Sequence, residues 1–374
     1  MTLKDIIKEY ENGNFETYQN LIEKLKKFER VYLYGISESA VVAVKVLSKN
    51  KIKINGILEA DSKKIGSMFN ELPVLSYNQI ADDSKTAIVI TCSYCEQIKK
   101  AIIANDKSAS KRIFVFDGYF LDKYKSGLYD ENKDKIYECY NSLNDAHSKK
   151  LYLALLKYRY TRKISLIENL FEPRTKTYYD SVFLNNFKDG LYVDAGSYNA
   201  DFIEGLSNLK DVSKCNFYIF EPNKMFAENI NANLNKNINY KVFQTALCDK
   251  KAKLDFEQIA SSTSHLIKKR YNAYKNTLQS KVETVEADTL DNIIGQNIVS
   301  GIKIDIEGAE QAMLKGSINT IKRDRPTMLI SIYHKWNDLW KIQSFIQEMD
   351  LNYSFYIRHY SLSVAKTILY CIPN

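Results

Sequence analysis

The chain has 374 residues, enough for two domains of ordinary size. Hydrophobic residues make up 45% of it and charged residues 26%, a balance that excludes a disordered or fibrous protein. The 53 basic and 45 acidic residues give a formal net charge of +8. This small excess suits an anionic small molecule as substrate and does not require nucleic acid as partner.

The sequence has no targeting or membrane-spanning pattern. No apolar run approaches the roughly 20 residues that cross a bilayer, and the first residues, MTLKDIIKEYENG, lack a signal-peptide core. We therefore expect a cytoplasmic protein without stable membrane insertion. The cysteines are scattered, so we expect reduced thiols. Cys92 and Cys95 form a C-x-x-C, but no second pair completes a zinc site, and we assign no metal.

Residues 1–120 are predicted to form N-terminal helices and a smaller Rossmann-like α/β domain. Apolar residues in 2–29 have the spacing of one buried helical face. From Val31 to Gly118, strand and helix patterns alternate, which indicates a parallel sheet covered on both faces. Residues 121–185 lack strand patterns and are predicted as a helical connector belonging to the second domain, with one long helix from Lys133 to Lys163.

The first domain carries part of a dinucleotide fingerprint. Gly35 stands at the first glycine position of G-x-G-x-x-G, but Ser37 and Ala40 occupy the other two. Glu59 and Asp61 end the next strand, near the spacing expected of a ribose ligand. Two interpretations stay open: a bound nucleotide or nucleotide sugar, or a structural domain used for docking or dimerisation.

The second domain is predicted over residues 186–374. Its strands, which alternate with helices, are predicted to form a seven-stranded sheet with an extra hairpin. The last two strands of the sheet are an antiparallel pair. The first strand, LYVDAG, ends in Asp194 and turns through Gly196, and the next, FYIFEP, ends in Glu221. This is the layout of a nucleotide-type cofactor site at the carboxyl edge of a parallel sheet.

The polar residues at this edge favour S-adenosylmethionine over a dinucleotide. A dinucleotide needs a glycine turn and a helix amino terminus against its anionic pyrophosphate, whereas S-adenosylmethionine has no phosphate. Asp194 would lie near the ammonium group or its water shell, and Gly196 would let the backbone approach closely. Glu221 would accept hydrogen bonds from both ribose hydroxyls.

The chain closely resembles the FkbM family of S-adenosylmethionine-dependent O-methyltransferases from about Asp130 to its carboxyl terminus. The resemblance rests on the blocks VDAGSYNADF, FEPN, ADTLD, IKIDIEGAEQAMLKG, ISIYHKWNDLW and YIRHYSLSVAKTILYCI. The most specific family signature, K-[IV]-D-[IV]-E-G-A-E, is intact at Lys303 to Glu310. The family usually has a glycine where this chain has Ala200 or Asp201, which puts the shape of the cofactor loop in question. The resemblance implies a class I methyltransferase fold.

The resemblance also implies site residues. The cofactor-binding set is Asp194, Gly196, Ser197, Tyr198, Glu221, Pro222, Ala246 and Leu247, the last two facing the adenine. Asp305, Glu307 and His334 would line the acceptor side as catalytic residues. A base near the acceptor hydroxyl helps methyl transfer. His334 has the more suitable pKa and Asp305 the more certain position, and either could instead be structural, Asp305 as a helix cap and His334 as a hydrogen-bond partner.

The predicted function is methyl transfer to a sugar hydroxyl of a nucleotide sugar, glycan or surface polysaccharide precursor; the sugar class comes from the resemblance alone. Alternatives are a non-catalytic nucleotide-sugar-binding or scaffolding protein, and a methyltransferase acting on nucleic acid or protein. An Asp305 and Asp288 pair could hold a divalent cation, but no ligand spacing requires one. Ser261 to Ser264 with His265 form either a substrate lid or an exposed turn, and homo-oligomerisation is left open.

Overall fold

The computed structural model describes residues 2–12, 17–80, 84–92, 94–105, 107–118, 128–259, 265–266 and 280–374. The chain divides into two compact units, and each is assembled from separate stretches of sequence. Unit 1 comprises Met1–Lys133, Lys150–Glu172 and Tyr360–Ala365, and unit 2 comprises Asp134–Lys149, Pro173–His359 and Lys366–Asn374. The region predicted as one helical connector, 121–185, is therefore shared between the two units.

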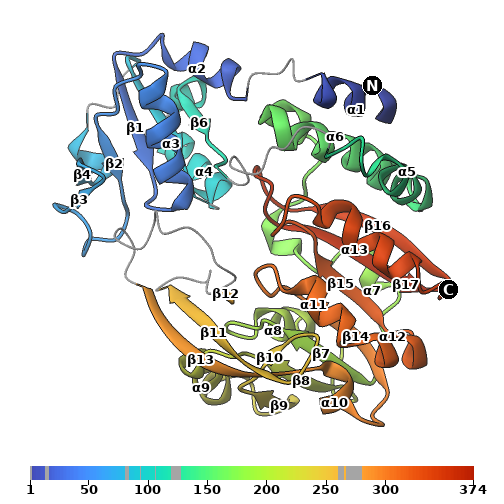
Figure 1. Ribbon diagram of the computed structural model, residues 1–374. Helices are drawn as coiled ribbons and strands as arrows, with labels where there is room; N and C mark the ends of the chain where they lie inside the picture. The colour runs from blue at the N-terminus through green and yellow to red at the C-terminus, as the bar shows by residue number, and fades with distance from the viewer. Residues whose placement is uncertain are drawn as a thin grey trace. The chain divides into compact units, whose positions relative to one another are not determined.

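Unit 1 is built on a six-stranded sheet in the order β3-β4-β2-β1-β5-β6 (Figure 1). Its strands are β1 (Arg30–Tyr34), β2 (Gly56–Leu58), β3 (Met68–Phe69), β4 (Leu72–Leu75), β5 (Thr86–Ile90) and β6 (Ile113–Val115). All neighbours are parallel except β3 and β4, which form a hairpin that the sequence patterns did not predict. The helices are α1 (Leu3–Glu11), α2 (Gln19–Leu25), α3 (Glu38–Lys49) and α4 (Cys95–Asn105).

The core of unit 1 follows from its apolar strands. Every residue of β5 is buried, as expected of a central parallel strand with helices on both faces. Ser37 precedes α3 and accepts a hydrogen bond from the backbone N–H of Ala40, which caps the helix start. The predicted α/β domain with a parallel sheet is confirmed in this part of the chain.

Unit 2 contains a seven-stranded sheet in the order β16-β17-β15-β14-β7-β8-β9 (Figure 1). Its strands are β7 (Leu191–Ala195), β8 (Asn216–Phe220), β9 (Asn239–Phe243), β14 (Val299–Ile304), β15 (Thr327–Ser331), β16 (Tyr353–His359) and β17 (Thr367–Pro373). Only β17 runs antiparallel to its neighbours. The chain leaves β7 toward β8 and β9, then returns to β14 and β15 on the other side, so the switch point of the sheet lies between β7 and β14. The predicted seven-stranded class I methyltransferase sheet is confirmed.

Two helical stretches are interrupted in the structure. The single helix predicted from Lys133 to Lys163 is two helices, because Asp145 turns its carboxylate back to accept the Ser148 N–H and starts a new helix. The helical stretch after β14 also breaks, at Gly316, where a Cβ atom would lie 2.0 Å from the carbonyl oxygen of Cys248. The helices in the rest of the described chain are α5 (Lys133–Ser142), α6 (Ala146–Thr161), most of which belongs to unit 1, α7 (Ser181–Leu184), α8 (Asp201–Ser207), α9 (Lys224–Asn233), α10 (Leu290–Ile294), α11 (Glu310–Lys315), α12 (Ile318–Asp324) and α13 (Asp338–Gln347).

A smaller sheet in the order β10-β13-β11-β12 contains the predicted hairpin. Its strands are β10 (Ala246–Leu247), β11 (Ala252–Ile259), β12 (His265–Leu266) and β13 (Ser280–Asp288). The hydroxyl cluster Ser261 to Ser264 lies outside the described residues, so its predicted role as lid or turn stays a prediction. Across the described part of the chain, every helix is too short or too polar to span a bilayer.

Candidate functional site

The carboxyl edge of the unit 2 sheet is centred on Gly196, the residue after β7. Its backbone has φ +75°, a left-handed conformation that favours glycine. Its N–H donates to the carbonyl oxygen of Phe220 at 3.0 Å, and a Cβ atom here would lie 2.0 Å from the carbonyl oxygen of Asp305. The loops after β7 and β14 therefore meet at the switch point with no room for a side chain.

Glu221 follows β8 and faces the loop after β7. One carboxylate oxygen, Oε2, accepts the backbone N–H of Tyr198 at 3.0 Å, and Oε1 accepts that of Asn223 at 2.9 Å. Burial raises the pKa of Glu221, and the two backbone hydrogen bonds partly offset this effect. Pro222 lies between Glu221 and Asn223, whose side chain caps α9. The sequence thus places a preorganised carboxylate beside the glycine turn.

Asp194 does not face the edge of the sheet. It is fully buried, and its partner Lys303 lies opposite it in the register of β7 and β14, with 2.9 Å between Nζ and Oδ1. Lys303 also donates to the carbonyl oxygen of Gly196 at 2.7 Å, and the Ser197 hydroxyl donates to Asp194 at 2.6 Å. These contacts have Asp194 holding the loop from within, and its predicted place near a ligand ammonium group stays a prediction.

The loop keeps a glycine-like conformation at the position where the family glycine was expected. Ala200 has φ +65° and Tyr198 has φ +57°, both in the left-handed region. Such a conformation costs a non-glycine residue about 1–2 kcal/mol. The departure from the family pattern is therefore a change of residue type, while the backbone retains the turn.

Ala246 and Leu247 lie apart from the strand whose end they were predicted to form. They make up β10, which pairs with Ala287 and Asp288 of β13, whereas β9 ends at Phe243. The ring of Phe243 stacks on that of Phe220 with 4.8 Å between centroids. An aromatic pair, missed in the sequence, thus stands beside Glu221 at the ends of β8 and β9.

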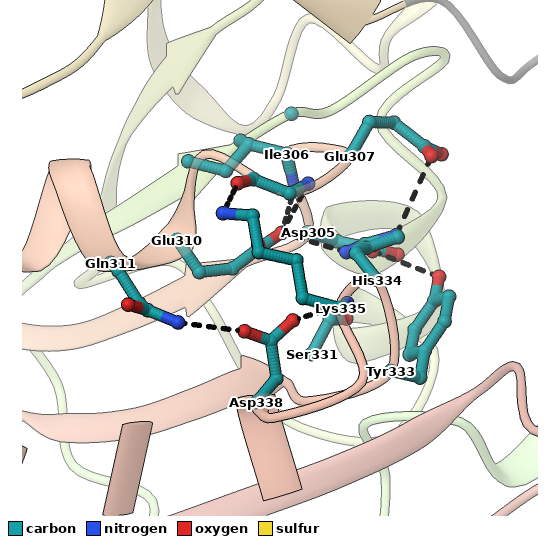
Figure 2. Close-up of polar contacts among 12 residues, drawn as sticks. Asp305, Ile306, Glu307, Glu310, Gln311, Ser331, Tyr333, His334, Lys335 and Asp338 are labelled. Atoms are coloured by element: carbon teal, nitrogen blue, oxygen red, sulfur yellow. Dashed lines mark hydrogen bonds and ion pairs between the residues drawn. The ribbon is translucent and has the colours of Figure 1, made fainter. Parts of the chain in front are cut away.

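The acceptor side gathers three carboxylates around a histidine (Figure 2). The Nδ1 atom of His334 lies 2.8 Å from Glu310 Oε1, and its Nε2 atom lies 3.4 Å from Asp305 Oδ1 and 3.5 Å from Glu307 Oε2. Burial alone would lower the pKa of His334, but the three carboxylates, Glu310 first, raise it to about 10. The raised pKa favours the imidazolium form at neutral pH and weakens the case for His334 as the base, so its catalytic role stays a prediction.

Asp305 is held as a carboxylate by four donors. It accepts from the hydroxyls of Tyr178 at 2.6 Å and Tyr333 at 2.9 Å and from Lys366 Nζ at 3.1 Å, besides the His334 contact. Burial would raise its pKa, but Lys366, His334 and the Tyr178 bond outweigh burial and lower it well below its ordinary value. A carboxylate that accepts from this many donors is a weak base. The sequence did not single out Tyr178, Tyr333 or Lys366, because they converge only in the fold.

Glu307 differs from the other two carboxylates. Its side chain is 31% exposed, while that of Glu310 is fully buried and accepts the N–H groups of Ile306 and Gly308. Burial raises the pKa of Glu307, which the charge of His334 only partly offsets. Its backbone has φ +53°, a strained conformation of the kind that clusters at functional sites. Figure 2 shows its carboxylate directed toward the His334 ring.

Two further observations at this edge concern packing and metal. Trp336 and Trp340 are 4% and 0% exposed, so they pack in the core. Among the residues that the structure describes, no group of three or more His, Cys, Asp or Glu side chains is arranged to hold a metal ion.

Residues 194–356 match the methyltransferase FkbM domain family, and 27–114 match the family described as C2185-like, N-terminal. The chain carries an FkbM methyltransferase domain. The predicted family is thus confirmed. The matched residues include the Gly196 turn, Glu221, and His334 with its three carboxylates, whereas Tyr178 and Lys366 lie outside the match. No curated protein matches the chain.

Among solved structures, the chain is similar to the methyltransferase FkbM from Methylobacillus flagellatus KT, with a TM-score of 0.65 over 98% of each chain at 17% sequence identity. At this identity the likeness bears on the fold alone, and it extends over both units. A precorrin-6y C5,15-methyltransferase from Geobacter metallireducens GS-15 is 14% identical over 55% of this chain and 93% of that one. Its TM-score of 0.29 is too low to support an argument.

Proposed function

We propose that the protein is an S-adenosylmethionine-dependent O-methyltransferase that acts on a sugar hydroxyl of a nucleotide sugar, glycan or polysaccharide precursor. The observation that carries the proposal is the Glu221 carboxylate beside the Gly196 turn, at the switch point of an FkbM methyltransferase domain. The sugar class rests on the family resemblance.

The residues at this edge fit S-adenosylmethionine. Glu221 offers a carboxylate for the ribose hydroxyls, and Gly196 lets the loops after β7 and β14 meet beside that carboxylate. The helix that follows, α8, starts with Asp201 and also carries Glu204 in its first turn, which disfavours a pyrophosphate there. When bound, S-adenosylmethionine supplies an electrophilic methyl group. Gly196, Tyr198 and Glu221 are the residues that we expect to hold it.

The charges on the acceptor side favour a neutral hydroxyl as acceptor. Three carboxylates, those of Asp305, Glu307 and Glu310, surround the two cations His334 and Lys366. A carboxylate acceptor would add a further negative charge to this group, which costs electrostatic free energy in a buried site. A hydroxyl adds none and can donate a hydrogen bond to a carboxylate.

We assign Glu307 as the group that takes the proton of the acceptor hydroxyl. It is the most exposed of the three carboxylates, with 31% of its side chain exposed, and burial raises its pKa, which makes it a stronger base than an ordinary glutamate. His334 then positions Glu307 by its charge, and Glu310 positions His334.

The test is calorimetric titration with S-adenosylmethionine, followed by detection of S-adenosylhomocysteine with a panel of nucleotide sugars and simple glycosides. We expect the unmodified chain to bind, and Glu221→Ala to weaken binding about 10-fold or more, since a charged hydrogen bond contributes about 1.5–3 kcal/mol. Glu286→Ala is the matched control, because that glutamate lies on a strand of the small sheet and pairs only with Lys253. Absence of binding by the unmodified chain would refute the proposal.

A further inference from the structure

The central strands of unit 1 repeat the order of the strands that carry the site in unit 2. In unit 1 the order is β4-β2-β1-β5-β6, and in unit 2 it is β9-β8-β7-β14-β15. In chain order both read third, second, first, fourth, fifth, and all five strands are parallel. The switch point of unit 1 therefore lies between β1 and β5, where open α/β sheets bind their ligands.

The glycine turn at this switch point has the same backbone contacts as the turn in unit 2. Gly35 follows β1 with φ +95°, and its N–H donates to the carbonyl oxygen of Leu58 at 2.9 Å, as Gly196 donates to Phe220. A Cβ atom on Gly35 would lie 2.9 Å from the Cβ atom of Cys92, which follows the fourth strand. In both units the loops after the first and fourth strands meet where only glycine fits.

A carboxylate occupies the equivalent place after the second strand. The N–H of Glu59 donates to Leu75 at 2.9 Å, extending β2 along β4 as Glu221 extends β8 along β9. Glu59 Oε2 accepts the N–H of Ile36 at 3.3 Å, so the half-buried carboxylate is directed toward the glycine turn as that of Glu221 is. Burial raises the pKa of Tyr34, and the charge of Glu59 adds to the effect.

The fourth strand ends differently in unit 1. Where unit 2 has Asp305, unit 1 has Thr91, whose N–H donates to Tyr34 as that of Asp305 donates to Ala195. The Thr91 hydroxyl donates to the carbonyl oxygen of Gly35 at 2.7 Å, so it braces the turn. Threonine in this role offers no base. The framework of a nucleoside site is present in unit 1 without the acceptor chemistry of unit 2.

We propose that unit 1 binds a ribonucleoside at the Gly35 turn, with the Glu59 carboxylate accepting hydrogen bonds from the ribose 2′ and 3′ hydroxyls. The nucleoside part is what this site recognises, because Ser37 already caps α3 and Glu38 opens its first turn, which disfavours phosphate there. The ribose diol is shared by adenosine compounds and by nucleotide sugars. The site goes beyond the proposed methyl transfer and uses none of its residues.

The experiment uses the full chain carrying Glu221→Ala, so that binding in unit 2 is weakened and signals from unit 1 can be separated. Saturation-transfer NMR and calorimetry are run with adenosine, with uridine diphosphate glucose, and with 2′-deoxyadenosine as the control that lacks one hydroxyl. We expect adenosine or uridine diphosphate glucose to bind, 2′-deoxyadenosine to bind at least about 10-fold more weakly than adenosine, and Glu59→Gln to cause a loss of similar size. Which of the two probes binds identifies the source of the nucleoside.

Glu59→Asp is the second variant, since it keeps the negative charge. It should retain part of the affinity if Glu59→Gln loses affinity through the missing charge and not through misfolding. Thermal unfolding of each variant checks the fold. The proposal is overturned if neither probe binds the Glu221→Ala chain, or if Glu59→Gln folds and binds unchanged. Failure of S-adenosylmethionine to bind the unmodified chain concerns the proposed function of unit 2 and leaves this measurement intact.

Discussion

His334 shows how far a residue's chemistry depends on neighbours that are distant in sequence. Histidine is the ordinary candidate for a base at neutral pH. Three carboxylates from the loop after β14 and the start of α11 convert this one into a fixed cation. The sequence predicted Asp305, Glu307 and His334 as site residues, whereas Glu310 was noted only as the end of the KIDIEGAE block. It could not predict the charge state of His334, because that state depends on how closely the three carboxylates approach the ring.

His334 is expected to remain protonated through neutral pH. In side-chain NMR of histidine-labelled protein, its signal should keep imidazolium shifts and titrate at about 10. The chain has four histidines, so His334→Gln identifies the signal. Because the folded pKa is raised above 6.5, the stabilisation is complete below about pH 6.5 and is lost as the pH rises through about 10. Titration of this signal near its ordinary pKa would contradict the cluster.

Replacement of Glu307 should slow methyl transfer and spare cofactor binding. Glu307→Gln removes the proton acceptor but keeps the side-chain size, so we expect the rate to fall about 100-fold or more. The dissociation constant of S-adenosylmethionine should change little, since Glu307 lies on the acceptor side. Glu307→Asp, which keeps a carboxylate, should recover part of the rate. Equal loss of binding and rate in Glu307→Gln would point instead to a role in shaping the cofactor site.

At the scale of elements, the sequence predicted strands better than it predicted the ends of helices. Strands such as β7 and β8 are short apolar runs with a charged residue close to their ends, Asp194 within β7 and Glu221 directly after β8, a local signal. The break at Gly316 depends on the carbonyl oxygen of Cys248, which a helical pattern does not reveal. The switch point between β7 and β14 was predictable from the order of strands, whereas the internal ion pair of Asp194 and Lys303 needed the register.

Gly196→Ala should disrupt the cofactor edge through a clash, and not merely through backbone strain. Its Cβ atom would lie 2.0 Å from a backbone oxygen, which cannot move as a side chain can. Gly295→Ala is the matched control, because it also has positive φ but no atom within 4 Å of the added Cβ. We expect Gly295→Ala to cost about 1–3 kcal/mol of unfolding free energy. Gly196→Ala should cost more unfolding free energy than this, measured by denaturant unfolding, and should abolish S-adenosylmethionine binding, measured by calorimetry. Similar losses in unfolding free energy for both variants would show that the loops can move apart.

At the scale of the whole molecule, the sequence predicted the two α/β parts but not how the chain distributes between them. The predicted ranges were consecutive, whereas unit 1 takes in 150–172 and 360–365. The reason is visible at Asp117, whose carboxylate accepts from Arg162, from the Tyr158 hydroxyl and from the N–H of Val364. Contacts between residues 247 positions apart leave no periodic signal in the sequence.

The buried ion pair of Asp117 and Arg162 should therefore be critical for unit 1. Both side chains are 1% exposed and lie 3.2 Å apart, so Arg162→Met leaves an uncompensated charge inside the protein. We expect a loss of about 3–5 kcal/mol in unfolding free energy. Lys64→Met is the control, because the Lys64 and Asp61 pair is half-exposed, 3.8 Å long and worth about 1 kcal/mol or less. By the same reasoning, a fragment of residues 1–133 should fail to give the dispersed NMR spectrum of a folded unit. It lacks Tyr158, Arg162 and Val364, which donate to the Asp117 carboxylate. A well-folded fragment would show that the later segments add to unit 1 without completing its core.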